Sequence, residues 1–254
     1  MTRKGAVVLG MVMAVLGLAA LAAPAMAQSV TLDLGGTAGG GSNSTTARII
    51  QLIALTTVLS VAPSILVMVT SFTRIVIVLG FVRQALGTMQ SPPNMVIVSL
   101  ALFLTAFVMA PTFEEAWNKG LQPYMDGQIE EAEAFERTVK PIHAFMMRHA
   151  REQDVQLFMD LSRAAEVAKP EDVPLKALIP AFMISELKRA FEIGFLIFLP
   201  FIIIDMVIAS VLMSMGMMMI PPAMVALPFK LIFFVLVDGW YMVVGSLVQS
   251  FGGA

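Results

Sequence analysis

Residues 193–222 read IGFLIFLPFIIIDMVIASVLMSMGMMMIPP, and Asp205 is the only charged residue among them. An apolar stretch of this length exceeds the roughly 20 residues that a helix needs to cross the hydrocarbon core of a bilayer. Pro221-Pro222 cannot continue a helix interior, so the stretch ends there. A second apolar stretch, residues 223–248, follows directly. Together the two stretches predict a helical hairpin in a membrane.

An earlier part of the chain repeats this plan. Residues 49–82 and 95–111 are apolar, and a turn at 87–94 with the sequence Ser91-Pro92-Pro93-Asn94 separates them. This pattern predicts a first hairpin over residues 49–111. Pro63 lies inside the first apolar stretch, where it removes a helical hydrogen bond, so we expect a kink there. Pro200 lies inside the stretch that starts at residue 193.

The composition agrees with a membrane protein. Hydrophobic residues make up 58% of the 254 residues and charged residues only 13%, against about 25% charged in soluble domains. The mean hydropathy is +0.85. A net charge of −2 offers no basic excess to neutralise phosphates, so we expect no nucleic-acid binding. The absence of cysteine excludes disulfides, thiolate metal sites and cysteine nucleophiles.

The charges concentrate in one polar excursion. Residues 113–192 hold 25 of the 34 charged residues, and residues 113–180 carry 13 acids and 8 bases, a net charge of −5. Apolar residues within the excursion recur at helical spacing. Cytoplasmic loops favour basic residues, so an acidic excursion predicts a periplasmic location.

The first 27 residues are typical of a secretory signal peptide. Arg3 and Lys4 precede an apolar stretch that ends in Ala25-Met26-Ala27, a small-residue cleavage site. The alternative is an uncleaved first transmembrane helix; we favour cleavage, because a polar stretch follows. Cleavage would place the mature N-terminus and the excursion on the same, periplasmic side.

These patterns predict an all-α integral membrane protein of two long kinked helical hairpins with a helical periplasmic insertion. The expected segments are a cleavable signal peptide (1–27), a Gly/Ser-rich flexible segment (28–47), the first hairpin (48–112), the insertion (113–192) and the second hairpin with its methionine-rich loop (193–254).

Enzyme chemistry is not indicated. His143 and His149 are six residues apart, which places them on different faces of a helix, unlike a pair of metal ligands. Glu130, Glu131 and Glu133 are typical of a solvated helix face. We therefore expect neither catalysis nor a metal or cofactor.

Four charged residues lie within apolar stretches: Arg74, Asp205, Lys230 and Asp238. Each is costly against lipid, so each should face protein or water. Lys230 and Asp238 are eight residues apart, too far for pairing within one helical turn, so each needs a partner elsewhere. The charges could form a proton or ion path, or could pair between subunits and specify assembly; we favour assembly.

Methionine is the abnormal residue type. Residues 206–224 hold seven of the 21 methionines, and Met217-Met218-Met219 lies between Gly216 and Pro221. Methionine is unbranched and adaptable, so it can fill a gap of changing shape. Such a triplet could be ordinary core; at a glycine–proline break we favour a deformable seal.

A series of motifs runs along most of the chain. They are Ser71-Phe72-Thr73-Arg74, Ala85-Leu86-Gly87-Thr88, Ser91-Pro92-Pro93-Asn94, Pro180-Ala181-Phe182, Ser185-Glu186-Leu187, Leu199-Pro200-Phe201, Met217-Met218-Met219, Pro228-Phe229-Lys230 and Val235-Leu236-Val237-Asp238-Gly239-Trp240. In this order they resemble one family, the FliP family of flagellar export-gate proteins, whose injectisome counterparts are the SctR-type proteins. The resemblance covers residues 48–251.

The resemblance implies a non-enzymatic, pore-forming subunit of the flagellar type III export gate in the bacterial inner membrane, at the basal body. Several copies would assemble with FliQ and FliR, FlhB and FlhA would join them, and unfolded flagellar subunits would pass through the centre. The family's methionine gasket falls on Met217, Met218 and Met219. The signal peptide favours a flagellar over an injectisome role. From the residues alone, a small-solute transporter that uses the buried charges remains the alternative.

Overall fold

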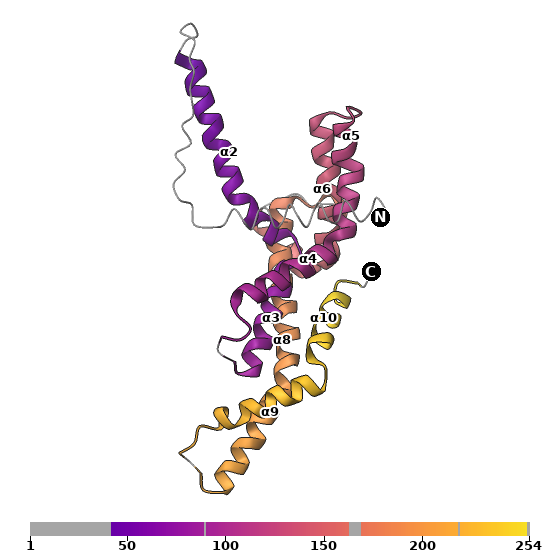
Figure 1. Cartoon of the computed structure of the whole chain (residues 1–254). Helices are drawn as coiled ribbons and strands as arrows, with labels where there is room; N and C mark the ends of the chain where they lie inside the picture. The colour runs from indigo at the N-terminus through magenta and orange to yellow at the C-terminus, as the bar shows by residue number, and fades with distance from the viewer. Residues whose placement is uncertain (1–41, 89, 163–168, 218, 253–254) are drawn as a thin grey trace, which may run out of the picture. The chain divides into compact units, whose positions relative to one another are not determined.

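The computed structural model describes residues 42–88, 90–162, 169–217 and 219–252 (Figure 1). All regular structure within these ranges is helical. The described residues divide into two units, with the boundary between Val61 and Ala62. The signal peptide expected at 1–27 lies outside the described residues. Helix α2, Ser42–Val69, begins inside the segment predicted to be flexible, so residues 42–47 are helical instead.

The first apolar stretch is divided into two helices. Pro63 lies inside α2 without ending it; α2 ends at Val69, and α3 runs Phe72–Leu86. At the break, the Thr70 hydroxyl lies 3.4 Å from the backbone nitrogen of Phe72, and the Thr73 hydroxyl donates to the carbonyl of Val67. Side chains that bond nearby backbone groups in this way compete with helical hydrogen bonds, which hydropathy alone does not register.

The next helix is longer than its apolar core. Residues 87–93 connect α3 to α4, Asn94–Ala116. Gly87 ends α3 with a φ of +76°, a left-handed conformation that glycine adopts without strain. Helix continues past Pro111 through a π-helical turn, Trp117–Leu121, into α5, Gln122–Met125. The expected stretch of 95–111 is therefore part of a continuous helical segment over Asn94–Met125.

The described residues of the polar excursion are largely helical. They form α6, Glu131–His149, α7, Glu152–Leu161, and a short 3₁₀ turn, Pro170–Asp172. Helix α8 then runs for 40 residues, Leu175–Ser214. It crosses the boundary expected at 192/193 without a break, because a change from charged to apolar residues alters the surroundings of a helix but does not end it.

The final apolar stretch is bent. Helix α9, Pro222–Leu236, and α10, Gly239–Gln249, meet at an angle of 63°. Asp238 adopts a φ of +51° at this break. A Cβ atom on Gly239 would lie 2.3 Å from the ring of Phe234, so the bend permits a close approach that only glycine allows. The sequence pattern indicated one apolar stretch over residues 223–248 and did not predict this bend.

The centre of the second unit is the pairing of α3 with α8, which lie side by side (Figure 1), with α6 and α7 against α8. Gly194 of α8 admits Phe81 of α3, because a Cβ atom at Gly194 would lie 2.3 Å from the Phe81 ring. That ring also makes edge contacts with Phe191 and Phe198. The apolar residues of the two helices thus form one core.

Membrane-length helices are present, as expected. Three described helical segments, Leu52–Val69, Asn94–Met125 and Leu175–Ser214, are long and apolar enough to cross a membrane, and the bent α9–α10 pair would make a fourth. The all-helical class and the presence of membrane-length helices are confirmed.

Candidate functional site

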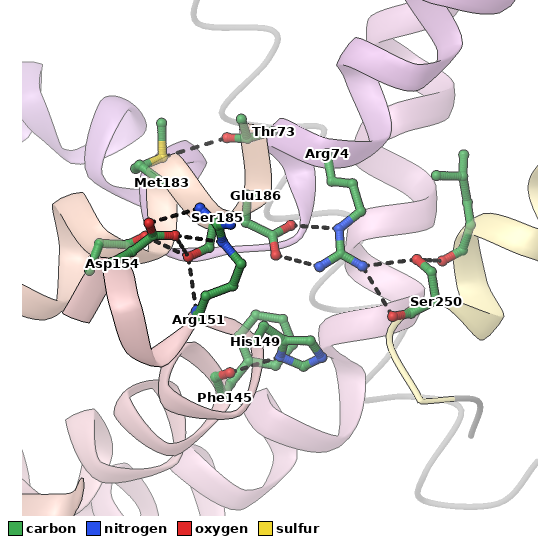
Figure 2. A network of polar contacts seen from close by, with 12 residues as sticks. Thr73, Arg74, Phe145, His149, Arg151, Asp154, Met183, Ser185, Glu186 and Ser250 are labelled. Atoms are coloured by element: carbon green, nitrogen blue, oxygen red, sulfur yellow. Dashed lines mark hydrogen bonds and ion pairs between the residues drawn. The ribbon is translucent and has the colours of Figure 1, made fainter. Parts of the chain in front are cut away.

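The centre of the buried polar network is Arg74, on the first turn of α3 (Figure 2). Its side chain and that of Glu186 on α8 are both fully buried. Nε of Arg74 donates to Oε2 of Glu186 at 2.9 Å, and Nη2 donates to Oε1. This paired, fork-like geometry is the strongest form of a carboxylate–guanidinium contact.

The residues after α10 complete the surroundings of Arg74. Nη1 donates to the carbonyl oxygen of Ser250 at 3.1 Å and lies 2.9 Å from its hydroxyl oxygen. The Arg74 guanidinium also lies 3.7 Å from the ring centre of Phe251, a cation–π contact. Arg74 therefore joins three segments that are distant in the sequence: α3, α8 and the end of α10.

Glu186 was missed as a site residue, although it stood within one of the family-like motifs. Its spacing from the neighbouring buried residues would have identified it. Leu178, Phe182 and Ala190 are fully buried and lie at four-residue spacing with Glu186 between them. A carboxylate in step with an apolar stripe must face the core, where it requires a cationic partner.

A second set of polar contacts fixes the start of α7 to α8. The backbone N–H of Arg151 donates to the hydroxyl of Ser185 at 3.0 Å, and that hydroxyl lies 2.6 Å from a carboxylate oxygen of Asp154. The Arg151 guanidinium holds the same carboxylate through two contacts of 2.8 Å. Ser185 precedes Glu186, so one turn of α8 carries both polar anchors (Figure 2).

His149, which was not expected to be a metal ligand, is buried at the end of α6. Its Nδ1 lies 2.8 Å from the carbonyl oxygen of Phe145, and its ring contacts those of Phe145 and Phe251. Burial lowers the pKa of His149, and the positive charges of Arg74 and Arg148 add to this effect, against hydrogen bonding to the backbone of Phe145 and Phe251.

The other expected charges separate into a pair and an exposed residue. Nζ of Lys230 on α9 lies 2.6 Å from Oδ2 of Asp205 on α8 and donates to the carbonyl of Ala85 on α3. Lys230 is buried and Asp205 is half-buried. Asp238 lies exposed at the α9–α10 bend, and no ion pair among the described residues involves it.

The methionine loop, residues 215–221, starts at a defined helix stop. Gly216 has a φ of +72°, its N–H donates to the carbonyl of Met213, and the N–H of Met217 donates to the carbonyl of Leu212. This is the Schellman arrangement, which ends a helix at glycine. Met217 is 39% exposed and Met219 is 98% exposed; Met218 lies outside the described residues.

Across the residues that the structure describes, an all-helical fold with membrane-length helices and with ion pairs that join α3 to α8 and α8 to α9 defines a helical membrane protein. Comparison with known families narrows this class. Residues 55–247 match the model of the FliP family. The chain belongs to the FliP family, and the prediction made from its motifs is confirmed.

Curated relatives carry the same family name. The chain is 57% identical to "Flagellar biosynthetic protein FliP" of Caulobacter vibrioides over 241 residues, which cover 94% of this chain and 89% of the relative. It is also 57% identical to the protein of that name from Bacillus subtilis, over 80% of this chain and 91% of the relative. The corresponding Rhizobium meliloti protein is 49% identical, over 93% and 97% of the two chains.

Breaking the central ion pair should cost stability. Replacing Arg74 by Met leaves Glu186 buried without its cation, so we expect a loss of about 3–5 kcal/mol, and replacing both residues by Met should recover part of it. The measurement is unfolding of the detergent-purified chain. The control is Arg137→Met, which removes an exposed ion pair with Glu133 and should cost less than about 1 kcal/mol. Equal losses in R74M and R137M would contradict the central role of Arg74.

Acidification should destabilise the protein through His149. Because the pKa of His149 in the folded state lies below its ordinary value of 6.5, the unfolded chain binds the proton more readily. Stability is therefore retained above pH 6.5 and lost below it, by up to about 1.4 kcal/mol per pH unit. Unfolding at pH 7.5 and 5.5 tests this against His149→Gln, whose loss on acidification should be smaller. An identical loss in H149Q would show that other groups are responsible.

Proposed function

We propose that this protein is a structural, pore-forming subunit of the flagellar type III export gate, which passes unfolded flagellar subunits across the bacterial inner membrane at the basal body. Membership of the FliP family and the names of its relatives support a role in flagellar biosynthesis. The membrane-length helices support the location. The observation that carries the pore-forming role is the exposed methionine loop.

The loop has the properties that a gate requires. A closed gate must exclude ions, and an open one must fit around a moving chain with side chains of every size. Methionine has three flexible torsions and an apolar, polarisable end, so it can follow such changes. Gly216 ends α8 on one side and Pro222 begins α9 on the other. Met217, Met218 and Met219 of each copy would form the constriction.

The apolar outer surface supports assembly with other subunits. Large side chains on α8 and α9, such as Phe195, Ile203 and Leu236, are exposed although the same helices bury others in the core. Exposed apolar surface on this scale marks contact with protein or lipid. Several copies would assemble with FliQ and FliR, and FlhB and FlhA would join the complex. The acidic insertion would face the periplasm once the signal peptide is removed.

The charges support a structural role in this function. Lys230 and Asp205 pair between α8 and α9, and Lys230 also binds the end of α3, so the pair fixes the position of the helices that flank the methionine loop. Asp238 stands exposed between two apolar helices, where a charge against lipid is costly. Contact with a neighbouring subunit would remove that cost.

Shortening the methionines should open the gate. Replacing Met217, Met218 and Met219 by Ala removes the flexible ends that fill the constriction, so resting cells should leak small dyes while the complex still assembles. Dye uptake in cells that carry the variant as their sole copy is the measurement. The control replaces Met206, Met213 and Met242, which are exposed on helices outside the loop, and should leave the membrane tight. A tight membrane with normal assembly of the loop variant would mean that the seal lies in another subunit.

Asp238 should serve assembly. Asp238→Asn removes the charge without changing the size of the side chain, so we expect a lower yield of the oligomeric complex on native gels. Asp126→Asn, at an exposed residue after α5, is the matched control and should assemble normally. Wild-type assembly of D238N together with loss of export would replace the assembly role by one in transport.

A further inference from the structure

The break between α9 and α10 has the construction of a hinge. On each side of it the backbone hydrogen bonds are intact: the N–H of Val237 donates to the carbonyl of Phe233, and the N–H of Met242 donates to the carbonyl of Asp238. The 63° bend therefore depends on very few residues. Asp238 adopts a left-handed conformation, which aspartate tolerates better than most residues but which glycine adopts at lower cost, so the bent form stores some backbone strain.

Helix α10 is attached to the rest of the second unit along one stripe. Val243, Leu247 and Phe251 are buried in the core at four-residue spacing, whereas Tyr241 and Met242 are exposed. Val244 and Val248 pack beside this stripe, and Trp240 makes an edge contact with Phe234 of α9. At the end far from the hinge, Ser250 and Phe251 meet Arg74. The attachment thus consists of a narrow apolar stripe along α10 and the contacts of Arg74 at its far end.

The residues that α10 covers keep their own partners when α10 is absent. When Ser250 is absent, Arg74 keeps its paired contacts with Glu186, and water can bind the freed Nη1. The Arg74–Glu186 pair, which detachment of α10 would expose, then still carries no net charge. Its neighbours Phe145 and His149 belong to α6, and His149 keeps its contact with the Phe145 carbonyl when its ring contact with Phe251 is lost. Detachment of α10 therefore leaves no charge without a partner.

We propose that α10 is a hinged strap, which closes over the Arg74–Glu186 pair through Ser250 and Phe251 and opens as a unit about Val237 and Asp238. Phe251 is the latch, because its ring contacts Arg74, Phe145 and His149 at once. The backbone strain at Asp238 opposes closure, and the contacts of Phe251 favour it. The strain and these contacts together set the balance between the closed and open forms. This proposal does not depend on the export role.

A single thiol can report opening, because the native chain has no cysteine. In the purified full chain, Leu247→Cys places the thiol at a site that is 1% exposed on α10, and Met242→Cys places it at a site that is 58% exposed. Maleimide should label Cys at 247 slowly and Cys at 242 quickly. Adding Phe251→Ala should accelerate labelling at 247 by about tenfold or more and leave labelling at 242 unchanged.

A third reporter separates opening of the strap from loss of the whole fold. Leu178→Cys lies on α8 at a site that is 0% exposed, and its labelling should stay slow when Phe251 is replaced. Equal acceleration at 178 and 247, or none at 247, would overturn the proposal. If Leu247→Cys does not fold, Val243→Cys serves as the reporter on the same stripe.

The hinge provides an independent test. Asp238→Gly relieves the left-handed strain and should slow labelling at 247, whereas Asp238→Val, whose branched side chain disfavours that conformation, should accelerate it. Labelling at 247 that does not respond to either change would show that the bend plays no part in opening.

Discussion

A guanidinium that has no access to water must find acceptors within the protein, and Arg74 imposes this requirement on the second unit. Glu186 accepts from two of its nitrogens, Ser250 accepts from the third, and Phe251 covers one face of the group. To pair Arg74 with Glu186, α3 must lie along α8 in one register, and in the closed form the end of α10 returns to both. The apolar core provides most of the buried surface, but apolar contacts alone allow many registers, whereas this pair allows one.

Hydropathy and proline placement predicted much of the helical content. The turn that contains Pro92 and the loop before Pro222 both lie between helices, as the sequence indicated. The breaks at Thr70 and Asp238 were not predicted, because each arises within an apolar stretch from local bonding or from close packing of neighbouring helices. The continuity of α8 across residue 192 was missed for the opposite reason, since its polarity changes there while its backbone hydrogen bonding does not.

The candidate site was predictable to the extent that a charge inside an apolar stretch attracts attention. Arg74, Asp205 and Lys230 were found in this way, and two of them pair with one another. Glu186 was passed over because charged residues surround it in the sequence, although its spacing places it on the buried stripe of α8. The role of Ser250 has no local signal at all, because a serine becomes an acceptor for Arg74 only when the folded chain brings the two together.

The separation of Arg74 and Ser250 also has a consequence for the order of events during synthesis. The two residues are 176 positions apart, whereas Arg74 and Glu186 are 112 apart. A nascent chain therefore carries Arg74 for more than a hundred codons before its carboxylate partner is translated, and for many more before the serine emerges. Over that interval the arginine must remain hydrated or borrow a transient acceptor. The contact between Arg74 and Ser250 is consequently a late step of folding. A chain whose synthesis stalls within α9 lacks Ser250 and cannot make this contact.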